Sequence, residues 1–377
     1  MGLRGSAGKG WLTVLLACAL GVSSAWSASG DSLARLGPEL ARIDAEGGPR
    51  IGVYVRDLAT GASASHHASE HWYLASTVKV PIAIAVLRGI ARGDYDLETP
   101  ITLRATDYVD GAGRTNSQPV GTGLSIRFLM EQMIIHSDNT ASDMLIGLVG
   151  LPQVNAVVQA IAPDAFGPIT TLAEVRRATY GHLVPGAQRL AGRDLLVLRQ
   201  QRTDDERLQY LARVVRVPVA QFQLPTLEQA YTAYYASGLN AGRLDAYGEL
   251  LAQLVDGKLL APEQTRYLMG LMERVATGTQ RIQAGLPPGA RFAHKTGTQR
   301  ARFCDAGIVR TATGSYERGV LVVACTQGDL SLVRAERALR QVGTALCRSG
   351  LLTQGVPDAP ACPVVPPART VPAAGGG

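Results

Sequence analysis

Two side chains able to perform nucleophilic chemistry together, Ser76 and Lys79, lie three residues apart. They share one face if the segment is helical, and the apolar run at 82–87 after Pro81 predicts a helix that is buried on most sides. A lysine amine in apolar surroundings loses part of its preference for the charged form, so it can accept the serine proton. The alternative is an ordinary surface serine and lysine, because this spacing occurs by chance in many proteins.

Two later segments favour the chemical interpretation. Ser137-Asp138-Asn139 comes first, and Lys295-Thr296-Gly297-Thr298 follows much later in the chain. Each motif is weak alone, but the ordered set S-x-x-K, S-D-N and K-T-G is typical of class A β-lactamases and penicillin-binding proteins. From Ile51 to Leu339, apart from one region, the chain therefore resembles a class A β-lactamase-like serine hydrolase.

The resemblance implies an α+β, two-lobed, β-lactamase-like fold. An antiparallel sheet flanked by helices would be built from both ends of the chain, with an all-helical lobe between them and the site at their junction. Hydrophobic periodicity predicts the elements themselves. Helices are expected at 31–46, 76–89, 125–136, 140–149, 243–254, 262–274 and 332–347, and strands at 51–56, 292–298, 306–310 and 320–325.

The resemblance also implies catalytic roles. Ser76 would attack an amide carbonyl, and Lys79 would take or relay its proton. Ser137 would pass a proton to the departing nitrogen, and Lys295 would orient Ser137 and attract the substrate carboxylate. The backbone N–H groups of Ser76 and Thr298 would form the oxyanion hole. Neither a metal ion nor an organic cofactor is needed.

Substrate-binding roles fall on the remaining motif residues. Thr296 and Thr298 would hydrogen-bond the substrate carboxylate, and Asn139 would hold the amide of the substrate's side chain. Gly297 would let a ligand approach the strand backbone closely. Asp138 is expected to tie its own loop together through backbone hydrogen bonds.

The resemblance fails between 162 and 239. Class A enzymes carry a short loop here, whose glutamate activates the water that cleaves the acyl-enzyme. An ungapped match places Leu172 at that glutamate and Arg176 where an asparagine is expected. Glu174 is the nearest candidate base, and the alternatives within the insert are Asp204, Asp205 and Glu206. We expect a helical insert at about 176–238, with helices at 195–200, 205–215 and 226–235. Such an insert is either a structural addition without a role in the reaction or a lid over the site.

Composition excludes some classes of protein. The chain has 377 residues, 46% of them hydrophobic, which is enough for one large domain or two lobes. Its net charge is +6, but the arginines are dispersed and no basic tract is interleaved with aromatics, so no nucleic acid partner is expected. His66, His67 and His71 are interpreted as surface histidines, because no carboxylate or cysteine has ligand-like spacing.

Export is indicated by the N-terminus. An apolar run at 11–22 follows basic residues and precedes an acceptable cleavage site at Ala25-Trp26-Ser27. This pattern predicts a signal peptide at 1–27, with lipoprotein cleavage at Cys18 as the alternative. We expect a monomeric periplasmic or secreted protein with no membrane span.

The rest of the chain divides into two parts. The hydrolase domain is expected at 28–354, and the Pro-, Ala-, Val- and Gly-rich segment at 355–377 predicts a disordered tail. Four cysteines remain after signal cleavage: Cys304, Cys325, Cys347 and Cys362. A hairpin turn at Gly314-Ser315 would make the first two face each other, either as a disulfide or as buried free thiols.

Three functions follow. The first is hydrolysis of the β-lactam amide bond through a Ser76 acyl-enzyme. The second is a D-alanyl-D-alanine peptidase acting on peptidoglycan stem peptides, which uses the same motifs without the loop glutamate. The third is a covalent β-lactam sensor or trap with little turnover.

Overall fold

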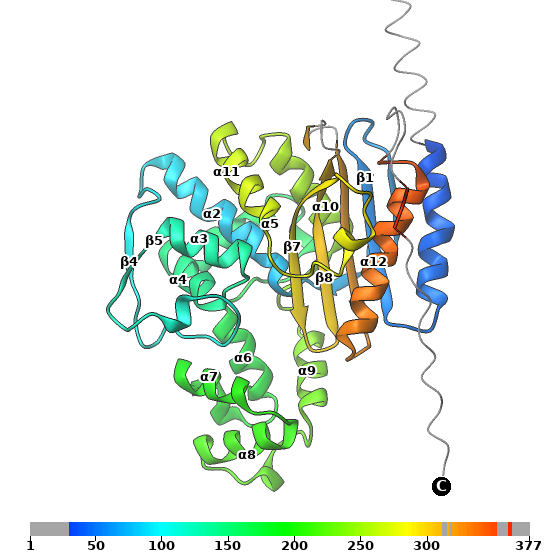
Figure 1. The fold of residues 1–377 in the computed structure, drawn as a ribbon. Helices are drawn as coiled ribbons and strands as arrows, with labels where there is room; N and C mark the ends of the chain where they lie inside the picture. The colour runs from blue at the N-terminus through cyan, green and yellow to red at the C-terminus, as the bar shows by residue number, and fades with distance from the viewer. Residues whose placement is uncertain (1–29, 311–314, 317–318, 353–360, 364–377) are drawn as a thin grey trace, which may run out of the picture.

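The structure, a computed structural model, describes residues 30–310, 315–316, 319–352 and 361–363. The signal peptide predicted at 1–27 and the alternative cleavage at Cys18 lie outside these residues, as does most of the tail predicted at 355–377. Within the described part, a β-sheet with its flanking helices adjoins a helical lobe (Figure 1). The predicted two-lobed α+β architecture is confirmed.

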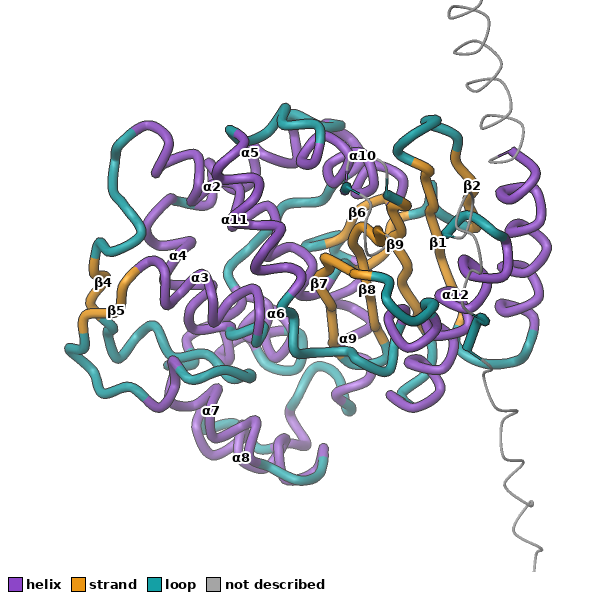
Figure 2. Tube along the Cα trace, turned by 45° about the horizontal axis from the view of Figure 1, so that its top comes forward, coloured by secondary structure: helices purple, strands orange, loops and turns teal. Residues whose placement is uncertain are grey.

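One antiparallel sheet of five strands, in the order β2-β1-β9-β8-β7, forms the first lobe. Its strands are β1 (Arg50–Asp57), β2 (Ser63–His66), β7 (Arg291–Gln299), β8 (Arg302–Arg310) and β9 (Val320–Gln327). Because β1 pairs with β9, the two ends of the chain meet in the middle of the sheet. Strand β7 is left at the edge, where it adjoins the helical lobe (Figure 2).

Different helices cover the two faces of this sheet. On β9, Val322 and Ala324 pack against the helix at 30–45 and α12 (Leu332–Ser349). The intervening residue Val323 belongs to the core of the helical lobe. Alternate side chains of a strand point to opposite faces, so the near-continuous hydrophobic sequence of β9 reflects burial on both sides.

The helical lobe contains five helices that the hydrophobic pattern predicts and one, α5 (Leu151–Gln159), that was not predicted. The five are α2 (Lys79–Arg92), α3 (Ile126–Ile135), α4 (Asn139–Val149), α10 (Leu244–Val255) and α11 (Pro262–Glu273). Two short two-stranded sheets complete it, β3 (His71–Tyr73) with β6 (Ala241–Arg243) and β4 (Pro100–Thr102) with β5 (Gly123–Ser125). Ser125 caps α3 by accepting a hydrogen bond from the Phe128 amide. No single described helix is long and apolar enough to cross a membrane; only α4 and α5 taken together, with a 91° bend between them, meet that measure.

The insert forms a cluster of helices beside the site. These are α6 (Leu172–Gly181), α7 (Gly192–Gln200), α8 (Asp204–Val215) and α9 (Leu227–Ala236), at the bottom of Figure 1. The predictions for the last three are confirmed, whereas α6 begins before the predicted start of the insert. The Tyr235 hydroxyl on α9 donates to the carbonyl of Arg300, which attaches the insert to the turn after β7.

Both cysteine pairs form disulfides. Cys304 and Cys325 occupy paired positions on β8 and β9, which confirms that they face each other and resolves the alternatives in favour of a disulfide. Of the predicted hairpin turn, Gly314 lies outside the described residues. Cys347 at the end of α12 bonds to Cys362, so the predicted tail has an anchoring point there.

The expectation of surface histidines holds for His67, which is exposed, whereas His66 is partly buried, and both lie beside a carboxylate. Folding brings the Asp44 Oδ2 atom to 3.0 Å from His66 Nε2 and 3.4 Å from His67 Nε2. His71, on β3, is exposed. Sequence spacing did not reveal this carboxylate, because Asp44 comes from the helix at 30–45 and the histidines from the second strand and the turn after it.

Candidate active site

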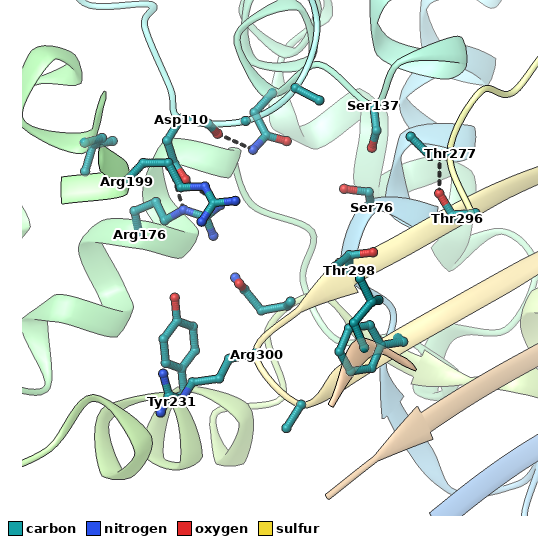
Figure 3. A pocket seen from close by; sticks show the side chains of 18 of the residues that line it. Ser76, Asp110, Ser137, Arg176, Arg199, Tyr231, Thr277, Thr296, Thr298 and Arg300 are labelled. Atoms are coloured by element: carbon teal, nitrogen blue, oxygen red, sulfur yellow. Dashed lines mark hydrogen bonds and ion pairs between the residues drawn. The ribbon is translucent and has the colours of Figure 1, made fainter. Parts of the chain in front are cut away.

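The three motifs line one cavity of about 540 Å³ at the junction of the lobes. Ser76, Ser137 and Asn139 line it from the helical lobe, and Thr296 and Thr298 line it from β7. Figure 3 shows Ser76 and Ser137 beside Thr296 and Thr298. Segments that are more than 200 residues apart in the sequence therefore meet at one opening.

Ser76 lies in a 3-10 turn, Ala75–Val78, rather than on the predicted helix, which begins at Lys79. Ala75 has a φ of 48°, a conformation that non-glycine residues rarely adopt and that recurs at active sites. A Cβ at Gly297 would lie 2.6 Å from the Leu74 carbonyl oxygen and 3.2 Å from the Ser76 nitrogen. Gly297 is thus required for the close packing of β7 against this turn, a cause different from the ligand approach expected from the sequence.

Lys79 is fully buried and well oriented. Its Nζ donates to the Ser137 carbonyl oxygen at 2.6 Å, to Asn139 Oδ1 at 2.7 Å and to Ser137 Oγ at 3.2 Å. Burial lowers the pKa of Lys79 to about 7, although the nearby carboxylates of Asp138 and Asp143 act in the opposite direction. The amine is therefore a base near neutral pH, as the surrounding apolar sequence predicts.

Ser137 links the two motif lysines. Lys295 Nζ donates to Ser137 Oγ at 3.0 Å, so this hydroxyl lies between Lys79 and Lys295. Burial, followed by repulsion from Lys79 and Arg281, holds the pKa of Lys295 well below its ordinary value. A bound carboxylate would favour the charged form of Lys295 again, because an opposite charge stabilises it.

The S-D-N turn is held by its own side chains. Asp138 Oδ1 accepts from the Ala141 amide and Oδ2 from the Thr115 amide, which confirms its predicted structural role. Asn139 donates through Nδ2 to the Asp110 carbonyl at 2.6 Å. Since its Oδ1 accepts from Lys79, Asn139 orients the lysine as well as lining the cavity.

Two residues at the site were missed from the sequence. Arg281 is 3% exposed and donates to Thr298 Oγ1 at 2.7 Å and to the Gly297 carbonyl at 2.9 Å. Thr277 shares a hydrogen bond of 2.5 Å with Thr296 Oγ1. Both residues hold the K-T-G strand in place from the segment before it. No local pattern in the sequence assigns a role at the site to either residue.

Glu174 does not lie with the other predicted site residues. Its side chain is exposed in the first turn of α6 and is not part of the cavity lining, which corrects its proposed placement as the deacylation base. Leu172 is buried at the start of α6. Asp143 accepts from the Leu172 and Ala173 amides at 2.6 and 2.8 Å, which fixes this helix N-terminus against α4.

The alternative bases in the insert do not line the cavity. Asp204 is paired with Arg207 and Arg300. Glu206 caps α8 by accepting from the Thr203 amide, and Asp205 is exposed. Among the residues that the structure describes around the cavity, Asp110 is the only carboxylate.

Known proteins resemble the chain over most of the described fold. The family model described as "Beta-lactamase enzyme family" matches residues 35–349. A β-lactamase of Rhodobacter capsulatus is 34% identical over 146 residues, covering 37% of this chain and 50% of the relative. A β-lactamase of Streptomyces cellulosae is 33% identical over 141 residues, covering 36% of this chain and 45% of the relative. These matches span about half the length of the curated relatives.

Solved structures agree on the fold. The crystal structure of a β-lactamase from Sphaerobacter thermophilus superposes with a TM-score of 0.63 at 24% identity, covering 85% of this chain and 99% of the other. A structure of the protein PBP-A superposes with a TM-score of 0.62 at 20% identity, covering 84% and 95%. With the family model matched over most of its length, the chain belongs to the β-lactamase enzyme family.

Proposed function

We propose that the chain is an exported serine hydrolase that opens the β-lactam amide bond through a Ser76 acyl-enzyme. The observation that carries this proposal is the Ser137 hydroxyl, held between two buried lysines at the opening where Ser76 lies. The β-lactamases among its relatives support the same activity. Family membership and the ordered motifs further support a class A enzyme that contributes to β-lactam resistance.

Acylation is the first half of the proposed reaction. The Ser76 oxygen attacks the amide carbonyl carbon, and its proton passes to neutral Lys79. The carbonyl oxygen becomes negatively charged and is bound by the N–H groups of Ser76 and Thr298, where each donor is worth about 3–4 kcal/mol. Ser137 then gives a proton to the departing nitrogen and regains one from Lys79, which returns to its neutral form. The C–N bond breaks, which leaves an ester on Ser76.

Substrate recognition is assigned to β7. Lys295 and Thr298 bind the carboxylate on the leaving side of the amide, and Arg281 holds the Thr298 hydroxyl toward it. The Thr296 hydroxyl at this end of the cavity is held in place by its hydrogen bond to Thr277. The machinery that we propose uses amine, hydroxyl and backbone groups for every proton transfer and charge, and it calls for no metal ion or organic cofactor.

A second candidate is a D-alanyl-D-alanine peptidase acting on peptidoglycan stem peptides. It is favoured by the position of Glu174, since the peptidase uses the same three motifs without a loop glutamate. A covalent sensor or trap would share this feature. Mass spectrometry of the intact protein over time with a penicillin tests all three functions. An adduct that forms and turns over supports a β-lactamase, a lasting adduct with peptide cleavage supports the peptidase, and the absence of any adduct contradicts acylation.

We expect acylation to slow as the pH falls through about 7. Lys79 must be neutral to accept the Ser76 proton, and its pKa of about 7 means that acid converts it to the charged form. The measurement is the second-order rate of acylation by a penicillin across this pH range. A Lys79→Met variant should be much slower and lose this limb of the profile. A wild-type rate that stays constant through pH 7 would contradict the assignment of Lys79 as the base.

We expect Lys295→Ala to damage the use of carboxylate-bearing substrates in two ways. It removes the charge beside Thr296 and the hydrogen bond to Ser137, so both binding and proton transfer suffer. A charged hydrogen bond is worth about 1.5–3 kcal/mol, which corresponds to roughly a 10- to 150-fold loss in kcat/KM. The matched control is Lys258→Ala, because Lys258 is exposed, pairs with nearby Asp256 and is not part of the cavity lining. Unchanged efficiency of Lys295→Ala on a penicillin would rule the role out.

Localisation belongs to the same proposal. The N-terminal pattern of basic residues, an apolar run and a cleavage site supports export to the periplasm or the medium. We propose that the mature chain works there as a monomer.

A further inference from the structure

Four arginines, three of them from the insert, extend the Ser76 cavity, and we call them the arginine annex: Arg176, Arg199, Arg207 and Arg300. The first three come from α6, α7 and α8, and the fourth comes from the turn after β7. In Figure 3, Arg176 and Arg199 lie on the side of Ser76 opposite to Thr277 and Thr296. The annex is therefore an opposite wall of the same cavity.

The positive charges of the annex exceed the negative charges that balance them. Arg176 binds Asp110 through both Nε and Nη2, at 2.7 and 3.0 Å. Arg207 and Arg300 share the single carboxylate of Asp204. Arg199 makes no hydrogen bond or ion pair with any residue in the described part of the chain. Four guanidinium groups thus face two carboxylates, which leaves an excess of two positive charges beside the cavity.

The annex also holds donors without acceptors. The Nε atom of Arg300 is buried and has no hydrogen-bond partner among the described residues. Tyr231 on α9 lines the same part of the cavity, and its hydroxyl points toward Arg176 in Figure 3. A buried donor without a partner is costly, and clustered guanidinium groups repel each other. An anion bound here would remove both costs.

The position of the annex identifies which part of a substrate it meets. Asn139 joins the two regions, because its Nδ2 donates to the carbonyl of Asp110, whose carboxylate binds Arg176. The leaving side of the amide is assigned to Lys295 and Thr298, on the other wall. A substrate whose carbonyl carbon is at Ser76 therefore directs its acyl side chain toward the annex.

We propose that the arginine annex binds a carboxylate at the end of the substrate's acyl side chain. The proposal rests on the acylation of Ser76 put forward above and names its substrate class: amides or β-lactams that carry one anionic group on each side of the scissile bond. Guanidinium groups suit this task because their planar forks match the two oxygens of a carboxylate. No other chemical step is added.

The test compares penicillins that differ only in the terminal group of the side chain. Glutaryl and adipyl penicillins carry a terminal carboxylate, and pentanoyl and hexanoyl penicillins are their neutral counterparts of equal chain length. We expect the wild-type protein to be acylated at least roughly tenfold more efficiently by one of the acidic compounds than by its neutral counterpart. The preference should weaken as the salt concentration rises.

Two variants on the same helix locate the effect. Arg199→Gln should reduce the acidic-to-neutral ratio severalfold, since Arg199 lines the cavity without a protein partner. Arg193→Gln is the matched control, because Arg193 is exposed on α7 and is not part of the cavity lining. Equal acylation rates for acidic and neutral compounds in the wild-type protein would overturn the proposal. An equal fall of the acidic-to-neutral ratio in Arg199→Gln and Arg193→Gln would overturn it as well.

A binding measurement separates failure of acylation from failure of the annex proposal. If none of the four penicillins forms an adduct, the proposed function fails, and calorimetry then tests whether the annex binds the side-chain carboxylate. Ser76→Ala protein, which lacks the nucleophile, is titrated with the glutaryl and pentanoyl compounds. Tighter binding of the glutaryl compound supports the annex, whereas equal affinity, or no measurable binding of either, overturns it.

Discussion

Replacing Ser76 with alanine is expected to abolish covalent labelling by a penicillin and to leave the fold intact. Ser76 is the serine of the S-x-x-K motif and lines the cavity with Ser137 and Thr298, and its replacement removes the oxygen that we propose forms the ester. Its side chain faces the cavity rather than the core, so little stability depends on it. Intact-mass measurement after incubation with a penicillin gives the labelled fraction, and the unfolding temperature reports on the fold.

Ser137→Ala is the matched control for this experiment. The variant loses the hydroxyl that receives hydrogen bonds from Lys79 and Lys295, but it keeps the nucleophile. We expect it to be labelled more slowly, with the adduct still on the peptide that contains Ser76. A labelled peptide containing any other serine, in either protein, would contradict the assignment of Ser76.

Much of the sheet and of the helical lobe could be predicted because their signals are local. The helix at 30–45 and α12 each bury one stripe of apolar residues, which appears in the sequence at helical spacing. The strand β9 was recognisable as a buried apolar run. The start of the nucleophile helix was misjudged by three residues, since the 3-10 turn that carries Ser76 depends on packing against Gly297, which is more than 200 residues away.

The supporting residues of the site could not be predicted for the same physical reason. Arg281 reaches Thr298 only because the segment before β7 folds back along the strand. The pairing of Asp110 with Arg176 joins a loop of the helical lobe to the insert, and neither residue belongs to a motif. Contacts of this kind depend on how elements pack together, whereas the three motifs were recognisable because each is contiguous in the chain.

The insert shows the limit of reasoning by resemblance. Leu172 stands where the family carries a glutamate, and the structure places it at the buried N-terminus of α6. The neighbouring acid, Glu174, was the natural substitute in the sequence. Residues two positions apart on a helix project from nearly opposite sides, and Glu174 falls on the exposed side. Proximity along the chain was therefore a poor guide to proximity in the site.

The largest remaining effect concerns the fate of the acyl-enzyme, which we expect to be hydrolysed more slowly than in an efficient class A enzyme. An ester needs a base to activate the attacking water, and such help is typically worth about 10²–10⁴-fold. Among the described residues that line the cavity, Asp110 is the only carboxylate, and both of its oxygens accept from Arg176. Asp143, whose pKa is raised by burial to about 6, has both oxygens bound by backbone amides of α6.

The measurement is the lifetime of the adduct after free penicillin has been removed, in the wild-type protein and in Glu174→Gln. We expect the two lifetimes to be equal, because the exposed Glu174 side chain does not reach the water that would attack the ester. A much longer lifetime in Glu174→Gln would make Glu174 the base after all and would require α6 to move. Equal and long lifetimes would favour a peptidase or a trap over an efficient β-lactamase. Rapid steady-state hydrolysis of a penicillin by the wild-type protein would refute slow deacylation outright, because the ester would then have a base that the cavity lining does not reveal.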